Sequence, residues 1–352
     1  MAQSAAAFSP FQKEQAHEVV VQSQWQTICR RFCQDKIALL ATILFSAIVL
    51  ATLAAPWISS HWLGFDPLDT SLLDRNKPPT WAKEAWPQFQ RFTQSCQKNG
   101  CAWRLWRTIA VESTQGMVSC FRAEPGVCHW LGTDATGRDV FVRGLHGGRV
   151  SLRIGLIVAM AALGLGVSLG LISGYYATSY VDDIINALIQ LINSIPVLLF
   201  LIVLSRLLEP GAIGLALLLS IFRWTNIARA LRGQIFSLRE QEYIVASRAV
   251  GSSVWRILLR QILPNVASLV IVFAVFSVAD AIIAEAGLSY LGVGIGPPTP
   301  SWGNMMQGSL SNFTNAPWLV LGPGLFIFLT TLSIYLMGDG LRDALDPMLA
   351  KK

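Results

Sequence analysis

SLREQEYIVASRAVGSSVWRILLRQILPN, residues 237–265, is the longest charged interval in the hydrophobic second half of the chain, and an apolar stretch flanks it on each side. Ser237 followed by Glu240 has the spacing of a capping box, in which each side chain bonds a free amide at a helix start. This spacing predicts that a helix begins at Ser237. That helix would carry one short apolar face made mostly of small residues, namely Tyr243, Ala246, Ala249 and Val250.

The same stretch carries signals for a turn and a second helix. Gly251 is suited to the left-handed position that ends a helix. Ser252 and Ser253 are natural N-caps for the next helix, and Pro264 should break or kink it. Because cytoplasmic loops of membrane proteins are rich in basic residues, the stretch is expected on the cytoplasmic side, on account of Arg239, Arg248, Arg256 and Arg260.

Composition sets the class of protein. The chain has 352 residues, of which 53% are hydrophobic and 14% charged, and this balance indicates an all-α polytopic membrane protein. The net charge of +6 is better explained by cytoplasmic Arg and Lys than by nucleic-acid binding, so no nucleic-acid partner is expected. No Gly-Lys pair occurs, which excludes a Walker A phosphate loop. We therefore expect no enzyme, and ATP, if used, would be hydrolysed by a partner.

Six apolar stretches are long enough to cross a membrane. Arg30, Arg31 and Lys36 precede the first stretch and place the N-terminal tail, residues 1–36, in the cytoplasm. Six crossings then return the C-terminal tail, residues 339–352, to the same side. The expected spans are residues 37–56, followed by five within a core of residues 151–338, at about 154–177, 184–205, 212–228, 266–284 and 318–337.

Residues 57–150 form a hydrophilic, Trp-rich insert that should lie outside the cell. An even number of cysteines in an oxidising compartment favours disulfides, and four cysteines allow three connectivities. A zinc site that includes His129 is the alternative, disfavoured because the cysteine spacing fits no common zinc finger. Cys29 and Cys33 should be free thiols. The four cysteines of the insert are hypothesised to pair as Cys96–Cys101 and Cys120–Cys128.

Several positions inside the expected spans are small or polar. Small residues recur every four positions at Ala162, Gly166, Gly170 and Gly174, which predicts close packing against another helix. Asn186, Gln190 and Asn193 share one helix face, and either a wet pathway or hydrogen bonds between helices would satisfy them.

Acidic residues and a proline also interrupt the spans. Pro196 should kink the third span. Asp280 lies well inside the fifth span, with Glu285 at its end. The pair could line a cation path, although an acidic residue near a wet cavity or paired with Arg is the favoured interpretation.

Residues 245–264 resemble the "EAA" loop of binding-protein-dependent ABC importer permeases, in which Glu-Ala-Ala is followed by three residues, Gly, nine residues and Ile-x-Leu-Pro. The Gly register matches at Gly251, and the Leu-Pro register matches at Leu263 and Pro264. Val245 replaces the Glu, so an acidic contact at that position is not carried over. Ser247 replaces the second Ala and Gln261 replaces the Ile, whereas Ala246 is retained.

Other segments are similar to the dipeptide, oligopeptide and nickel subfamily, in its "C"-type permease, and together they extend from about Leu131 to Pro347. The stretch that holds the first three of these segments, residues 131–152, should form an interfacial amphipathic helix whose arginines stay at the level of the lipid headgroups. The segments read LGTD at 131–134, GRDV at 137–140, GGRVSL at 147–152, PPTPSWG at 297–303 and GDGLRDALDP at 338–347.

The resemblance implies the type I ABC importer permease fold with six transmembrane helices, in the bacterial inner membrane. It also implies a second homologous permease subunit, two ATPase subunits that bind the ATP and Mg²⁺, and an external substrate-binding protein. No cofactor or metal is expected in this chain. The ATPase subunits would dock on the coupling loop, residues 233–264, through Glu242, Tyr243, Ala246, Ser247, Arg248, Gly251, Ser252, Arg256, Leu263 and Pro264.

The sequence leaves alternatives open for the substrate and for the energy source. The spans contain no His or Cys cluster suited to nickel, which favours peptides over nickel or another small solute. An ion-gradient-driven secondary transporter is the alternative of a different class. Such a transporter would need inverted repeats and charges near the membrane midplane, and Asp280 is the one firm candidate for such a charge.

Overall fold

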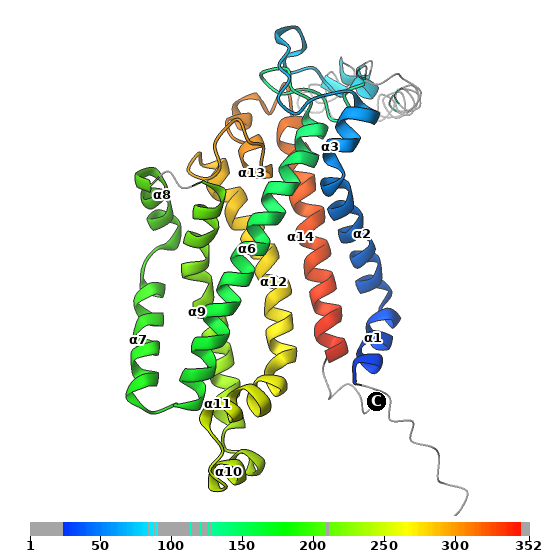
Figure 1. Cartoon of the computed structure of the whole chain (residues 1–352). Coiled ribbons are helices and arrows are strands. Elements are labelled where there is room, and N and C mark those ends of the chain that lie inside the picture. Colours follow the sequence, from blue (N-terminus) through cyan, green and yellow to red (C-terminus); the bar gives the residue numbers. More distant parts are fainter. Residues whose placement is uncertain are drawn as a thin grey trace, which may run out of the picture.

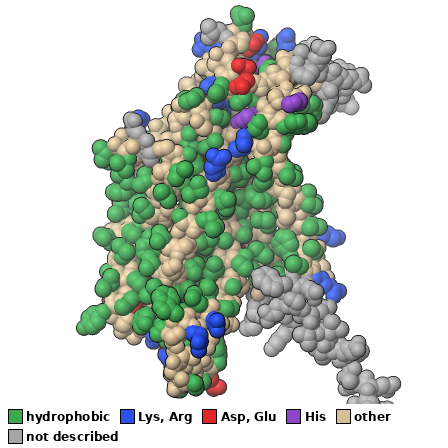
Figure 2. Space-filling view, in the orientation of Figure 1, with side chains coloured by type: hydrophobic (Ala, Val, Ile, Leu, Met, Phe, Trp, Pro, Cys, Tyr) green, Lys and Arg blue, Asp and Glu red, His purple; other side chains and the backbone are tan. Residues whose placement is uncertain are grey.

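The computed structural model describes residues 24–83, 85–87, 89–90, 113, 120, 126, 128–208 and 211–345. These residues form long helices that stand side by side (Figure 1), and their one β pairing is an isolated bridge between Thr133 and Asp139. On the face drawn in Figure 2, hydrophobic side chains form a broad band across the bundle, whereas many of the charged side chains lie toward its two ends. The prediction of an all-α polytopic fold is confirmed.

Five helices in the described part of the chain are long and apolar enough to cross a membrane, and a sixth span arises if a bent pair counts as one. The first is α2 (Lys36–Leu53), which follows the short α1 (Gln24–Gln34). The other four are α6 (Val140–Tyr175), α9 (Ala212–Leu238), α12 (Leu263–Tyr290) and α14 (Trp318–Leu345). The bent pair is α7 (Tyr180–Ser194) and α8 (Val197–Leu208).

Helix α6 begins 14 residues before the predicted span at 154, and it runs unbroken for 36 residues. Asp139 starts it, because its carboxylate accepts a hydrogen bond from the amide of Val142 at 2.8 Å. The predicted separate interfacial helix over 131–152 is therefore wrong. Residues 131–139 form a loop, and residues 140–152 are the first turns of the spanning helix itself.

Glycines hold α6 against α9. A Cβ atom on Gly166 would lie 2.7 Å from the Cβ of Ile227, and a Cβ atom on Gly174 would lie 2.6 Å from that of Ile235. A Cβ atom on Gly170 would lie 3.0 Å from the carbonyl oxygen of Ala228. The predicted small-residue stripe is thus the surface on which α9 packs, since only residues without a side chain permit this separation.

The third span is broken rather than kinked. Helices α7 and α8 meet at 80° around Ile195 and Pro196. Ile195 has an extended backbone (φ −82°, ψ 129°), as expected of a residue before proline, and Pro196 cannot donate the amide that would continue the helix.

The described residues of the insert between α2 and α6 lie at the end of the bundle that also carries α13 (Trp302–Met305), opposite to α10 (Figure 1). It continues through α3 (Ala55–Trp57), a π turn η2 (Ile58–Leu63) and the 3₁₀ turns η3 (Leu72–Asp74) and η4 (Thr80–Ala82). A 3₁₀ turn η6 (Ser309–Asn312) follows α13 in the other loop at this end.

One of the two predicted disulfides lies within the described residues. Cys120 and Cys128 form a disulfide with their Cα atoms 5.6 Å apart, whereas Cys96 and Cys101 lie outside the described residues. Cys29 and Cys33 are exposed thiols. The Nδ1 atom of His129 lies 2.7 Å from the Oδ2 atom of Asp139, the residue that starts α6.

The loop before α6 is ordered by Asp134. Burial disfavours its charged form, but a hydrogen bond from the Thr136 hydroxyl, bonds from the amides of Thr136 and Arg138 and the Arg138 guanidinium outweigh this, so the pKa of Asp134 falls below its usual value. The carboxylate therefore stays ionised and holds residues 134–138 in one turn.

The packing of α6 on α9 gives a test with an internal control. Gly166→Ala should lower the free energy of unfolding by about 1–3 kcal/mol, because its new Cβ meets Ile227. Gly164→Ala, two residues away, has no atom within 4 Å of the new Cβ and should be neutral or stabilising by up to about 1 kcal/mol. Thermal unfolding in detergent measures both variants, and equal midpoints would contradict this packing.

Candidate functional site

The chain leaves the bundle between α9 and α12 and forms a short protruding segment. This segment contains α10 (Glu242–Ala249), α11 (Val254–Ile257) and a π turn η5 (Leu258–Ile262) that runs into α12. Helix α10 extends beyond the ends of the long helices (Figure 1). We call residues 239–262 the end segment.

The first helix of the end segment does not begin where the sequence predicts. Ser237 lies in the last turn of α9, where its hydroxyl donates to the carbonyl of Gln234 at 2.8 Å. The predicted capping box is therefore wrong. Buried Leu231 and Ile235 keep α9 packed as far as Leu238, and α10 starts only at Glu242, without a side-chain cap.

The turn after α10 is the one that the glycine predicts. Gly251 has φ of +80°, and its amide donates to the carbonyl of Arg248 at 2.9 Å. The amide of Ser252 donates to the carbonyl of Ser247 at 3.0 Å, which completes a Schellman motif. Ser253 occupies the N-cap position of α11, although its hydroxyl makes no capping bond.

The predicted break of the second helix at Pro264 does not occur, because one helix runs from Val254 to Tyr290, whereas the predicted kink at Pro264 stays a prediction. The π turn over Leu258–Ile262 precedes it, and Pro264 sits in the first turn of α12. A proline is tolerated there because its missing amide is one that the first turn of an α-helix leaves unpaired. The segment from Val254 to Tyr290 therefore acts as one continuous element.

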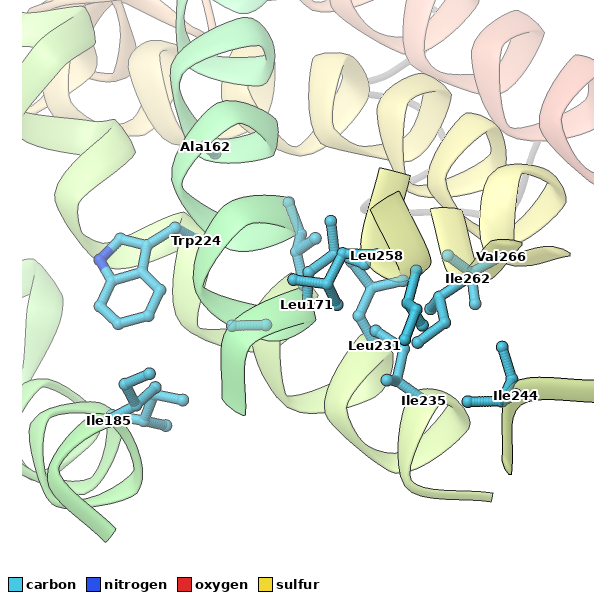
Figure 3. Packing of buried hydrophobic residues seen from close by; sticks show 14 residues of the cluster. Ala162, Leu171, Ile185, Trp224, Leu231, Ile235, Ile244, Leu258, Ile262 and Val266 are labelled. Atoms are coloured by element: carbon cyan, nitrogen blue, oxygen red, sulfur yellow. The ribbon is translucent and has the colours of Figure 1, made fainter. Parts of the chain in front are cut away.

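Helix α10 is attached to the bundle by Ile244, its only buried residue. Ile244 is fully buried and belongs to an apolar cluster to which α6, α7, α9, α11 and α12 also contribute (Figure 3). Other members of this cluster include Ile235, Ile257, Leu258 and Ile262. No periodic apolar pattern points to Ile244, because an eight-residue helix that touches the bundle along one edge buries a single side chain.

Polar contacts fix the orientation of α10. Gln261 donates to the Ser247 hydroxyl at 2.8 Å, and Asn265 donates to the Tyr243 hydroxyl at 3.1 Å. The Arg248 guanidinium lies 4.9 Å from the centre of the Tyr175 ring, at the end of α6. These contacts tie the short helix to α6 and α12 at once.

The face of α10 that points away from the bundle is the one that the sequence predicts to be apolar. Tyr243 is 44% exposed and Val250 is 86% exposed. Further exposed apolar side chains that the sequence analysis did not select are Val245, Trp255 and Leu259. Of the expected docking residues, Ser247, Ser252 and Leu263 are half-buried, and the others are exposed, namely Glu242, Tyr243, Ala246, Arg248, Gly251, Arg256 and Pro264.

A second group of polar side chains lies inside the bundle. Arg223 donates to the carboxylate of Asp280 at 2.9 Å, and the Tyr335 hydroxyl donates to the other carboxylate oxygen at 2.5 Å. The three residues join α9, α12 and α14, and the Arg223 and Asp280 side chains are 31% and 39% exposed. Arg223 is the twelfth of the 27 residues in α9, so it lies well inside this helix.

Glu285 does not line a path together with Asp280. It is completely buried and accepts hydrogen bonds from Ser151 at 2.9 Å and Ser289 at 2.7 Å. Because Ser151 is on α6, the carboxyl group joins α6 to α12.

The three amide side chains of α7 differ in their hydrogen bonds and in their exposure. Asn186 donates to Asp182 at 2.6 Å, whereas Asn193 accepts from Thr225 of α9 at 3.1 Å and Gln190 is exposed. Asp182 is a buried residue of α7 whose carboxylate binds the Arg232 guanidinium of α9 through two bonds.

Comparison with known proteins assigns the chain to a family. Residues 166–351, more than half of its length, match the family described as binding-protein-dependent transport system inner membrane component. The chain belongs to this family. Residues 23–79 also match the N-terminal TM domain of oligopeptide transport permease C. The chain is thus a permease subunit and a multi-pass inner membrane protein.

Relatives agree with this assignment. The permease is 33% identical to the oligopeptide transport system permease protein OppC of Bacillus subtilis over 94% of this chain and 91% of that protein. It is 39% identical to the glutathione transport system permease protein GsiD of Pectobacterium atrosepticum, over 64% of this chain and 74% of the relative. It is also 39% identical to the dipeptide transport system permease protein DppC of Alkalihalophilus pseudofirmus, over 63% and 73%.

The attachment of α10 to the permease bundle can be tested directly. Ile244→Ala should weaken this attachment by about 2–5 kcal/mol, because it leaves a cavity in the apolar cluster. Val245→Ala, at the adjacent exposed position, should change stability by no more than about 0.5 kcal/mol. Hydrogen exchange of the amides in α10 should accelerate in the first variant alone. Equal exchange in both variants would show that Ile244 does not hold the helix.

Proposed function

We propose that this permease subunit conducts peptides across the membrane in an ATP-driven importer, and that the end segment receives the movement of ATPase subunits. The observation that carries the proposal is α10 itself, a short helix whose Ile244 is buried in an apolar cluster at the bundle while most of its other side chains are exposed. Large apolar side chains left exposed beside arginines are typical of a surface that binds a protein partner.

Peptides are the proposed substrates because the relatives are named for oligopeptide, dipeptide and glutathione transport. Nickel and other small solutes have no such support among them. A secondary transporter driven by an ion gradient is also less favoured, because the carboxylate of Asp280 is engaged by Arg223 and Tyr335. An acidic group so engaged is a poor carrier for a coupling cation.

We propose that the α10 end lies in the cytoplasm, together with both termini. Arginines gather at this end of the bundle, as the positive-inside rule requires of a cytoplasmic face. Helix α1, which carries Arg30 and Arg31, and the C-terminal end of α14 lie at the same end (Figure 1). The arginines of the segment that joins α9 to α12 are Arg239, Arg248, Arg256 and Arg260.

The proposed assembly contains a second permease subunit, two ATPase subunits that bind ATP and Mg²⁺, and an external substrate-binding protein. The polar group of Arg223, Asp280 and Tyr335 supports the second permease subunit. Charged side chains that remain 31% and 39% exposed within the membrane would be costly against lipid. A second subunit facing them would enclose a wet pathway, and the exposed side chains of Gln190 and Asn193 on α7 are further candidates to line it.

The rigid attachment of α10 would transmit movement of the ATPase subunits to the spanning helices. A movement of the ATPase subunits that pushes on α10 reaches α12 through the bonds from Gln261 and Asn265, and α6 through Tyr175. Because the apolar cluster around Ile244 is closely packed, the helices must move with α10 rather than deform around it.

The Schellman turn offers the test. Gly251→Val forces a β-branched residue into the left-handed region at a cost of about 1–2 kcal/mol or more, and the turn should change. Gly251→Asn is the matched control, because Asn adopts this conformation routinely and no atom lies within 4 Å of the new Cβ. Peptide uptake and ATP hydrolysis are measured in vesicles that hold the complete importer.

The Val variant should take up at least several-fold less peptide per ATP hydrolysed, with the complex still assembled, while the Asn variant should behave like the unmodified protein. Full coupling in the Val variant would contradict the role of the end segment. Uptake of metal ions but not peptides by the unmodified importer would contradict the proposed substrate.

A further inference from the structure

An apolar crevice opens on the side of the bundle where α2, α6, α12 and α14 meet. Its volume is about 570 Å³, and most of its lining is hydrocarbon. Three lining side chains are polar, and they lie together at the end near α3, as Thr52, Arg149 and Arg153. Since Gly148 packs directly on Thr52, Arg149 is level with the end of α2, which is the end of the first span.

The two arginines have no partner of their own. Neither Arg149 nor Arg153 makes an ion pair or a hydrogen bond with any other part of the chain that the structure describes. Arg149 is half-buried, and Arg153 is exposed. Their spacing of four residues puts both guanidinium groups on one face of α6, where two like charges repel each other unless an anion lies between them.

The dimensions of the crevice match one lipid leaflet. From Arg153 to Leu163, the deepest lining residue on α6, ten residues of helix rise about 15 Å, half of a hydrocarbon core of roughly 30 Å. The lining along this depth is apolar, from Leu156 and Met160 on α6 to Val278 on α12 and Ile334 on α14. On the face drawn in Figure 2, Lys and Arg side chains also appear at the upper part of the hydrophobic band.

We propose that this crevice is a binding site for one anionic phospholipid of the leaflet at the α3 end. Arg149 and Arg153 hold the phosphate, and an acyl chain lies along α6 between α2 and α12. Charge complementarity selects the anionic lipid, because a zwitterionic headgroup brings its own cation next to the two arginines. This inference depends on the chain crossing a membrane, and it does not depend on the proposed coupling role of the end segment.

Lipid retention by the intact importer tests the proposal. The complex, with its partner subunits, is placed in nanodiscs of phosphatidylcholine with a minority of phosphatidylglycerol, and native mass spectrometry measures which lipid stays bound after release. The unmodified complex should retain phosphatidylglycerol in preference to phosphatidylcholine. Arg149→Gln with Arg153→Gln should reduce this preference by about tenfold or more.

Two further variants separate the site from general surface charge. Arg206→Gln removes an exposed arginine from the last turn of α8, away from the crevice, and should leave the preference unchanged. Leu156→Trp should fill part of the crevice and weaken retention while both arginines remain, with little risk to folding because Leu156 is 57% exposed.

Loss of the preference in the Arg206 variant as well, or its persistence in the double variant, would overturn the assignment. So would the absence of any retained phosphatidylglycerol in the unmodified complex, the outcome expected if a helix of the second permease subunit fills the crevice. Transport is not the readout, so a failure of this proposal is distinguishable from a failure of the proposed function.

Discussion

The burial of Ile244 is the contact on which the functional account depends. Helix α10 has only eight residues, too few to be stable in water on its own, so its structure comes from packing against the bundle. One side chain supplies that packing, and it enters a cluster shared by α6, α7, α9, α11 and α12. The remainder of α10 is therefore free to face a partner while its position stays fixed relative to the spanning helices.

Inside the bundle, each of three acidic side chains is paired or hydrogen-bonded. Asp182 is bound by Arg232, Asp280 by Arg223 and Tyr335, and Glu285 by two serine hydroxyls. Each group joins two or more helices. Charges in a membrane are tolerated when they are paired or hydrogen-bonded, so these contacts also fix which helices are neighbours. Arg149 and Arg153 of α6 have no such partner among the residues that the structure describes, and for that reason they indicate a ligand from outside the chain.

The sequence predicted those features that depend on one residue's backbone or on a repeat. Gly251 requires a left-handed turn, the glycine stripe requires a close neighbour, and apolar runs require a membrane. It failed where tertiary packing overrides a local signal. Ser237 has a good capping pattern, but buried Ile235 extends α9 past it. Pro264 is a helix breaker by type, but it falls at a helix start, where its missing amide costs little.

Other features had no local signal. The partners of Asp182 and Asp280 lie about 50 residues away in the chain, so spacing could not reveal the two ion pairs. Ile244 has no periodic apolar companion within α10. Such contacts are set by the arrangement of helices, which the sequence pattern determines only in outline.

The most direct test of the central claim is a distance measured across the permease in two nucleotide states. Spin labels are attached at Ala246 on α10 and at Ile213 in the first turn of α9. Both positions are exposed, and they lie at opposite ends of the bundle. If α10 and α9 move as one body, the distance between the labels should change by no more than about 2 Å when the assembled importer binds ATP. A shift of about 5 Å or more, the size of one helical turn, would show that α10 moves independently of the bundle and would contradict the account.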